Sequence, residues 1–262
     1  MDLKLKDKVV MITGSTGGVG EALTKAFAEE GCKLAISSTK QEKLDKLLSE
    51  VKIDPDKLLT FVVDVTNESQ IKDMVEKTVA KWGRIDAQVN NAGYEGKSLP
   101  LDVQTDENMH NVYNVNIFGP LYGMKYALPH MKEQKGGAIV NITSQGSIVG
   151  APTMSAYVSS KHAAFGLSKC AALEVAELGI HINCIGPGPI DTPMMTKLEK
   201  QALGENVSKE EAMKVFAAPY PDKRYCRPEE VADLALFLAS EKSSHITGSL
   251  ITMDGGQAAT SR

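Results

Sequence analysis

The sequence predicts an α/β protein built on a doubly wound parallel sheet of about seven strands, with helices on both faces. Three observations support this fold class. Short apolar runs rich in β-branched residues alternate with amphipathic helical patterns along the chain. A glycine-rich turn separates the first apolar run from the first helical pattern. Neither a repeat nor a Pro/Gly/Ser-rich linker interrupts the alternation, so we expect one domain over residues 1–262.

Four predicted strands lie in the first half of the chain, at 8–13, 33–37, 59–63 and 85–89. The helix after the first strand is predicted because four apolar residues share one of its faces, namely Ala22, Leu23, Ala26 and Phe27. Gly31 ends this helix. Two further amphipathic helices are predicted at 39–51 and 66–82.

The second half continues the alternation with strands at 138–142, 180–185 and 249–253. Its predicted helices cover 105–133, 155–178 and 228–239. The exception is the segment 186–225, which is rich in Pro, Met and Lys. It follows the carboxyl end of a strand, where ligands bind in this class of fold, so we expect a substrate lid there.

Composition argues against several functions. A net charge of −4 without a long basic run gives no electrostatic footprint for nucleic acid. No apolar run approaches the roughly 18 residues that span a bilayer, and residues 1–7 hold no apolar signal-peptide core. We expect free thiols, no metal site and a cytoplasmic location, because the cysteines are far apart, at Cys32, Cys170, Cys184 and Cys226.

The glycine-rich turn at 13–20 reads TGSTGGVG. Glycine lets the backbone approach a pyrophosphate closely, and the following helix N-terminus attracts its negative charge. A strand before the turn and a helix after it are typical of the Rossmann-type dinucleotide fold. The turn residues expected to bind the cofactor are Gly14, Ser15, Thr16, Gly18, Val19 and Gly20.

Two more strand ends are expected at the same edge of the sheet. Asp64 and Val65 end the third strand, where a carboxylate can accept a hydrogen bond from an adenine amino group. Asn91, Ala92 and Gly93 end the fourth strand, where small and amide side chains suit close packing against a cofactor. An ordinary turn is the alternative for the second cluster.

Tyr157 and Lys161 are spaced i and i+4 on a predicted helix, so their side chains share one face. A free Tyr has a pKa of about 10 and exchanges protons poorly at neutral pH. A nearby cation favours the phenolate and lowers that pKa. The pair is therefore a candidate acid/base centre, although a surface Tyr and Lys at this spacing are common.

The motifs TGxxxGxG, NNAG, YxxxK and PGxIxT occur in this order, with a Ser before the Tyr. On these motifs the chain resembles the short-chain dehydrogenase/reductase family, in its single-domain branch. The resemblance covers essentially the whole chain and includes members similar to 3-oxoacyl reductases and hydroxysteroid dehydrogenases. It implies hydride transfer between a nicotinamide cofactor and a carbonyl or secondary alcohol.

The resemblance also assigns catalytic roles. Ser144, thirteen residues before Tyr157, would polarise the substrate carbonyl. Tyr157 would exchange the proton, and Lys161 would bond the nicotinamide ribose and lower the Tyr pKa. The main-chain carbonyl of Asn116 would hold a relay water. Pro120, four residues later, supports this role because it has no N–H to donate to that carbonyl.

Cofactor preference depends on the end of the second strand. NAD-preferring members of the family carry an acidic residue there, whereas this chain has Ser38, Thr39 and Lys40. Hydroxyls and an ammonium suit a 2′-phosphate, so we expect NADP(H), with NAD(H) as the alternative. Gly17 opposes this choice, because many NADP-preferring members have a basic residue there. The resemblance also assigns cofactor contacts to Pro187, Gly188, Ile190 and Thr192.

The residues expected at the substrate are Ser144, Gln145, Met154, Tyr157, Met194 and Met195, and the pocket wall is also expected to include Tyr94, Ser147 and parts of 198–220. Methionine there suits a bulky or flexible apolar substrate. Three classes remain open: a 3-oxoacyl thioester, a steroid or bile-acid ketone, and a sugar or small alcohol. The resemblance implies a homotetramer or homodimer built from the long helices. A non-catalytic nucleotide-sensing scaffold is the second hypothesis.

Overall fold

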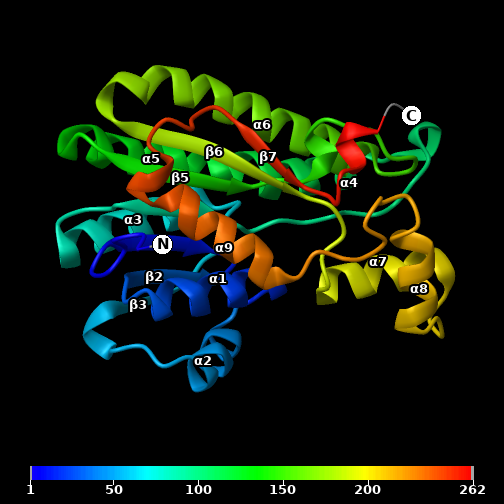
Figure 1. The fold of residues 1–262 in the computed structure, drawn as a ribbon, viewed down its shortest axis with the longest axis horizontal. Coiled ribbons are helices and arrows are strands. Elements are labelled where there is room, and N and C mark those ends of the chain that lie inside the picture. Colours follow the sequence, from blue (N-terminus) through cyan, green and yellow to red (C-terminus); the bar gives the residue numbers. More distant parts are fainter. Residues whose placement is uncertain (1, 261–262) are drawn as a thin grey trace.

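The computed structural model describes residues 2–260, which form one seven-stranded parallel sheet (Figure 1). The strands are β1 Val9–Thr13, β2 Lys33–Ser38, β3 Leu58–Val62, β4 Ala87–Asn90, β5 Gly137–Ile142, β6 Ile180–Pro187 and β7 Leu250–Met253. Their order in the sheet is β3-β2-β1-β4-β5-β6-β7. The predicted fold class is confirmed. The first residue and the last two of the expected domain 1–262 lie outside the described residues.

The strand order reverses beside β1. Val10 of β1 lies opposite Leu34 of β2 on one side and opposite Ala87 of β4 on the other. From β1 the chain builds the sheet outward through β2 and β3, then returns to add β4 on the opposite side. Because parallel strands end at a common edge, a crevice for ligands opens at this reversal.

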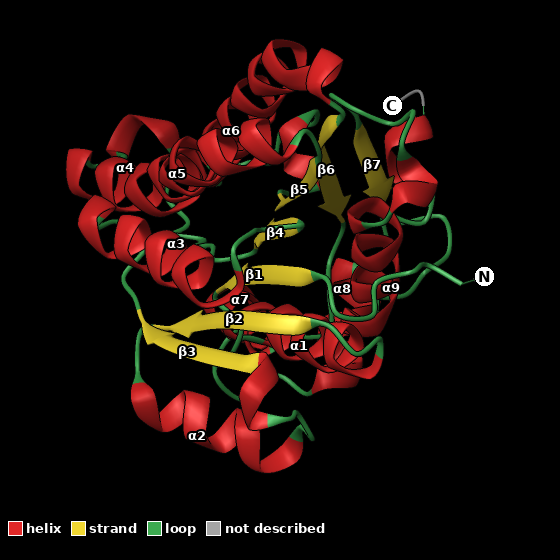
Figure 2. Cartoon of the chain, turned by 90° about the vertical axis from the view of Figure 1, so that its left-hand side faces the viewer, coloured by secondary structure: helices red, strands yellow, loops and turns green. Residues whose placement is uncertain are grey.

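Helices cover both faces of the sheet (Figure 2). One layer contains α1 Gly18–Glu29, α2 Gln41–Glu50 and α9 Pro228–Ala239. The other contains α3 Glu68–Trp82, α4 Asp106–Tyr113, α5 Gly119–Gln134 and α6 Ser155–Val175. Within these layers α1 packs against α9, and α3 packs against α5.

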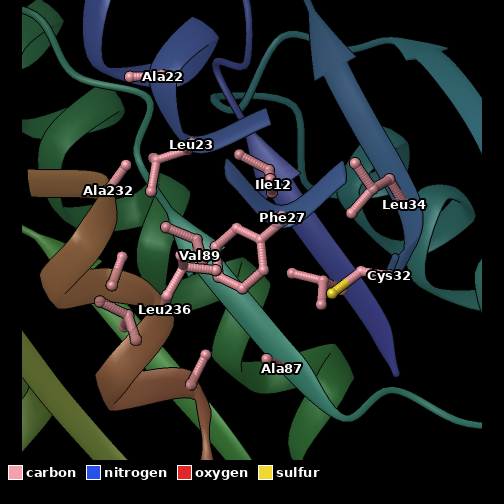
Figure 3. Packing of buried hydrophobic residues seen from close by; sticks show 14 of the residues in the cluster. Ile12, Ala22, Leu23, Phe27, Cys32, Leu34, Ala87, Val89, Ala232 and Leu236 are labelled. Carbon is pink, nitrogen blue, oxygen red and sulfur yellow. The ribbon is translucent and has the colours of Figure 1, made fainter. Parts of the chain in front are cut away.

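Successive side chains along each strand point to opposite faces of the sheet, and they contribute to two hydrophobic clusters, one on each face. In β1, Val10 and Ile12 belong to the cluster under α1 and α9, whereas Met11 belongs to the cluster under α3 and α5. Phe27 of α1 is fully buried in the first cluster, where Figure 3 shows it near Ile12 and Val89. Continuous apolar runs are expected of strands that are buried on both faces.

The predicted helix over 105–133 differs in detail from the structure. It is divided into α4, a π-helical segment Asn114–Phe118 and α5. In the π segment the N–H of Gly119 bonds the carbonyl of Asn114, five residues back. Pro120 explains the irregularity, because it cannot donate the hydrogen bond that would continue an α-helix through this turn.

The segment 186–225 carries two helices, α7 Pro193–Leu203 and α8 Lys209–Phe216. They enclose a small apolar core of Met195, Ala217 and Tyr225, separate from the two main clusters. The base of the segment is closed by backbone hydrogen bonds, because the N–H of Cys226 donates to Pro189 and that of Asp191 donates to Cys226. The segment therefore packs as a unit beyond the end of β6 (Figure 1).

Truncation of Phe27 tests the packing of the first cluster. We expect Phe27→Ala to lower the free energy of unfolding by about 3–5 kcal/mol, because the fully buried ring leaves a cavity. Urea denaturation followed by circular dichroism measures the change. Val215→Ala is the matched control, because Val215 is 53% exposed on α8 and its loss should cost less than about 0.5 kcal/mol. Equal effects of the two variants would contradict the assignment of the core.

Candidate active site

Two adjoining cavities lie at the carboxyl-terminal edge of the sheet. One, of about 570 Å³, extends along the glycine-rich turn and the ends of β2, β3 and β4. The other, of about 670 Å³, lies between the loops after β4 and β5 and helix α7. The residues that line both cavities are Tyr157, Ile190, Thr192 and Met194. A ligand in the first cavity can therefore meet a ligand in the second at the Tyr157 side chain.

The glycine-rich turn is too tightly packed for side chains. A Cβ at Gly20 would lie 2.1 Å from the carbonyl oxygen of Gly14, and one at Gly14 would lie 2.8 Å from Ala92 Cα. Gly14 also has a φ of +65°, which disfavours other residues. Ser15 is buried and donates its hydroxyl to Ser37 O at 2.7 Å. The turn thus presents backbone at the start of α1, as an anion site requires.

Side chains at the ends of neighbouring strands line the first cavity and fix the turns around it by hydrogen bonds. Asn91 Nδ2 donates to the carbonyl oxygen of Gly14 at 2.8 Å, which ties the end of β4 to the turn after β1. Asp64 lines the cavity after β3, and its carboxylate accepts hydrogen bonds from the N–H and hydroxyl of Thr66. The sequence-predicted turns at these strand ends therefore do converge.

Most of the predicted cofactor residues line this cavity, namely Gly14, Thr16, Gly18, Val19, Gly20, Ser38, Thr39, Asp64, Val65, Asn91, Ala92, Gly93, Tyr157, Lys161, Ile190 and Thr192. Four do not. Ser15 lies behind the turn, Pro187 lies outside the lining, and Gly188 lines the second cavity. Lys40 pairs with Glu42 at 3.5 Å and also lies outside the lining.

Sequence reasoning missed Lys43, which lines the cavity beside Ser38 and Thr39. It lies three residues after Lys40 on α2. The sequence could have indicated Lys43, because it follows the end of β2 by about one and a half helical turns and lies near the same edge of the sheet. Tyr94, Thr143 and Met194 also line the cavity without having been assigned to the cofactor.

Helix α6 brings Tyr157 and Lys161 together. Lys161 is 5% exposed, and its ammonium donates to the carbonyl oxygen of Ile142 at 3.2 Å. The same ammonium lies 5.5 Å from the centre of the Tyr157 ring. Ser144 lines the second cavity with Tyr157, and its Oγ accepts from the N–H of Gly146 at 3.0 Å. Thr143, by contrast, is buried and donates its hydroxyl to Ile185 O.

Burial dominates the acid/base properties of the pair. It raises the pKa of Tyr157 above its usual value, with the Ser144 side chain acting in the opposite direction. It also lowers the pKa of Lys161 to about 8. We expected the Lys161 cation to lower the Tyr157 pKa, but burial has the largest effect on this phenol, and Lys161 is not among the groups that shift its pKa.

Asn116 lies in the π segment and is 1% exposed. Its amide donates to Ser160 Oγ and to the carbonyl of Tyr94, both at 2.9 Å, and accepts from the N–H of Tyr94 at 2.9 Å. A Cβ at Gly93 would lie 3.6 Å from Lys161 Nζ and 3.7 Å from Asn116 Oδ1. The side chains of Asn116 and Lys161 therefore both lie against Gly93.

Most of the predicted substrate residues line the second cavity, namely Ser144, Gln145, Met154, Tyr157, Met194 and Met195. Tyr94 and Ser147 do not, since Ser147 is buried and Tyr94 lines the first cavity. Helix α7 contributes much of its apolar wall, with Met194, Met195 and Leu198. Gln145 donates to the hydroxyl of Tyr220, which comes from the end of the segment 186–225. Sequence reasoning missed Glu95, a carboxylate in the wall that is 6% exposed.

Within residues 2–260, no cluster of three or more His, Cys, Asp or Glu side chains is placed to hold a metal ion. None of the helices in the described part of the chain is both long and apolar enough to cross a membrane.

Comparison with known proteins agrees with this geometry. The family model for enoyl-(acyl carrier protein) reductase matches residues 14–258. The 3-oxoacyl-[acyl-carrier-protein] reductase FabG of Thermotoga maritima is 39% identical over 254 residues, which are 97% of this chain and 99% of the relative. Levodione reductase of Leifsonia aquatica is 38% identical over 258 residues, which are 98% and 96% of the two chains.

Solved structures give the same fold. The crystal structure of levodione reductase has a TM-score of 0.93 and 37% identity, covering 98% of this chain and 100% of the other. ElxO with NADP bound has a TM-score of 0.88 and 34% identity, covering 97% and 100%. NAD⁺-bound xylitol dehydrogenase has a TM-score of 0.89 and 29% identity, also covering 97% and 100%.

The fold and the paired cavities define a dinucleotide-binding α/β enzyme. This chain belongs to the short-chain dehydrogenase/reductase family, which confirms the resemblance drawn from its motifs. Its relatives are named dehydrogenases and reductases, so the protein is an oxidoreductase that acts on CH–OH or carbonyl groups.

Replacement of Lys161 by Met tests the burial of its ammonium. The Lys161 pKa is about 8 in the folded protein and ordinarily 10.5, so the unfolded chain binds the extra proton between these values. Wild-type stability should therefore rise relative to Lys161→Met between about pH 8 and 10, by about 2 kcal/mol. Urea unfolding of both proteins across this pH range measures how the difference between their free energies of unfolding changes with pH. Any stability that Lys161→Met loses equally at every pH does not affect this change. A constant difference would show that Lys161 is not desolvated.

Proposed function

We propose that the protein reduces a ketone to a secondary alcohol, and catalyses the reverse oxidation, with NADP(H) as the preferred cofactor. The observation that carries this proposal is the meeting of the two cavities at Tyr157. One cavity suits a dinucleotide, and the other presents Ser144 and apolar side chains to a carbonyl compound.

The first cavity fits a nicotinamide dinucleotide. Glycines 14 and 20 leave no room for a Cβ, and residues at the start of α1 line the cavity, where their backbone N–H groups would hold the pyrophosphate. Lys161 and the residues Ile190 and Thr192 line its inner end and would hold the nicotinamide riboside. When bound, the nicotinamide supplies a hydride to the carbonyl carbon or accepts one from the alcohol carbon.

The protein's own residues would move the proton. Tyr157 gives its phenolic proton to the carbonyl oxygen during reduction and takes it back during oxidation. Burial raises the Tyr157 pKa, which keeps the phenol protonated at neutral pH and ready to donate. The Ser144 hydroxyl donates to the same oxygen and polarises the carbonyl. The Lys161 ammonium stabilises the phenolate left behind.

Asn116 would complete the path for the proton. Pro120 offers no N–H to its main-chain carbonyl, and we assign that carbonyl to a water that restores the proton on Tyr157 through Lys161. The Asn116 side chain fixes the neighbouring backbone by its bonds to Tyr94 and Ser160.

The choice of NADP(H) rests on the end of β2. The side chains there that line the cavity are Ser38, Thr39 and Lys43, and none of these three is acidic. Two hydroxyls and an ammonium match a 2′-phosphate. Structures of similar proteins with NADP and with NAD⁺ keep NAD(H) as the alternative.

For the substrate we propose a ketone or secondary alcohol with a mainly apolar body. A cavity of about 670 Å³ falls in the usual range for small-molecule sites, and three methionines line it. Relatives named for 3-oxoacyl, levodione and diacetyl substrates keep the thioester, cyclic-ketone and small-ketone classes open. The segment 186–225 would act as the lid of this cavity.

We further propose a homotetramer or homodimer in the cytoplasm. Leu173 on α6 is 83% exposed and Phe118 beside α5 is 40% exposed, which supports contact through these helices. The alternative of a non-catalytic nucleotide-sensing scaffold is disfavoured, because Ser144, Tyr157 and Lys161 line the two adjoining cavities and Asn116 bonds Ser160, the neighbour of Lys161.

Tyr157→Phe tests the proton transfer. It removes the hydroxyl alone, so we expect kcat to fall by about 10²–10⁴-fold while NADPH binding stays near wild type. NADPH oxidation with diacetyl, levodione and a 3-oxoacyl thioester measures turnover, and nucleotide fluorescence measures binding. Tyr126→Phe on α5 is the control, because this tyrosine bonds Glu68 away from both cavities. A Tyr157→Phe enzyme with wild-type rates would refute the role, and a wild type inactive on every ketone would favour the scaffold.

Lys43→Ala tests the cofactor choice. We expect it to raise the KM for NADPH by about tenfold and to leave the KM for NADH nearly unchanged, because it removes a charged donor to the 2′-phosphate. Lys40→Ala should have a smaller effect, since Lys40 pairs with Glu42 outside the cavity. Steady-state kinetics with both cofactors gives the result. Equal use of NADPH and NADH by the wild type would exclude the preference.

A further inference from the structure

The loop at 94–97, which follows β4, is fixed at both ends by asparagine side chains. Asn116 bonds both the N–H and the carbonyl of Tyr94. Asn108 does the same for Lys97, accepting from its N–H at 2.8 Å and donating to its carbonyl at 3.0 Å. Gly96 between them has a φ of +74° and no room for a Cβ, which would lie 2.4 Å from a Val112 methyl group. The backbone of the loop at 94–97 is therefore held firmly in one conformation.

The loop at 94–97 places Glu95 in the wall of the substrate cavity. The carboxylate is 6% exposed and pairs with the ammonium of Lys197, which comes from α7. The Lys197 ammonium also lies 5.7 Å from the centre of the Tyr94 ring. The ion pair thus joins two walls of one cavity: the fixed loop at 94–97 and the helix that supplies Met194 and Met195.

Other polar contacts of α7 stay inside its own segment. Glu199 accepts from the hydroxyl of Tyr225 at 2.7 Å, and Lys200 pairs with Glu205 at 3.8 Å. Both partners belong to 186–225, so these contacts would move with the segment. Lys197 reaches beyond it to Glu95. Loss of Lys197 would leave a buried carboxylate without its cation, which costs more than loss of an exposed pair.

We propose that Glu95 and Lys197 latch α7 over the substrate cavity and thereby control how tightly the substrate is retained. The latch rests on the proposed function, because it assigns the second cavity to the substrate. Its electrostatic nature predicts that reversing both charges preserves the closure, whereas reversing one opens it.

Hydrogen exchange and kinetics test the latch with Lys197→Met, which keeps the aliphatic stem and removes the charge. We expect amides in 193–203 to exchange about fivefold faster in the protein without substrate. We expect the KM for diacetyl or levodione, whichever the wild type reduces, to rise about fivefold while kcat stays within about twofold. The double variant Glu95→Lys/Lys197→Glu should recover most of both changes.

Lys200→Met is the matched control, since it removes the same charge from the same helix and leaves Glu95 paired. Wild-type exchange and KM in Lys197→Met would overturn the latch, as would an equal effect of Lys200→Met or no recovery in the double variant. If the wild type reduces no ketone, the proposed function fails, but the exchange arm still decides whether the ion pair holds α7.

Discussion

The common direction of all seven strands is the constraint on which the site depends. A parallel sheet covered by helices on both faces buries its central strands, so a ligand site has room mainly where the strands end. Because every strand ends at one edge, turns from distant parts of the chain meet there. Gly14 and Asn91 are joined in this way by a hydrogen bond between the ends of β1 and β4. The reversal of strand order beside β1 opens the space between them.

The same burial that stabilises the fold sets the chemistry of α6. Lys161 is buried with the carbonyl of Ile142 as its acceptor, and burial lowers its pKa to about 8. Tyr157 is held nearby with a raised pKa. Desolvation thus moves both groups toward their neutral forms. A protein that only needed stability would place neither group here, so their burial agrees with a site in which a proton and a charge are exchanged over short distances.

The sequence was sufficient for the features that depend on local pattern. Apolar runs located all seven strands, and the glycines and asparagines at strand ends located the first cavity, because close backbone approach admits few residue types. The sequence was insufficient to predict which partner a charged side chain contacts when several lie within reach. Lys40 lies beside Glu42 outside the cavity, whereas Lys43, one helical turn later, lines it. Glu95 gave no local signal, because its partner Lys197 is about a hundred residues away in the chain.

The π-helical segment makes chain length itself a determinant of the site. A π-helical turn spends one residue more than an α-helical turn on the same advance along the axis. Removing one residue from Asn114–Phe118 would suit a regular helix, and α4 and α5 would keep nearly the same phase, because an α-helical turn with one residue fewer rotates the chain about as far as the π-helical turn. Asn108 on α4 would still face the loop at 94–97, whereas Asn116 would lose the widened turn in which it now lies. The extra residue therefore serves the shape of this one turn, and a deletion there would act on the site while the two helices kept their places.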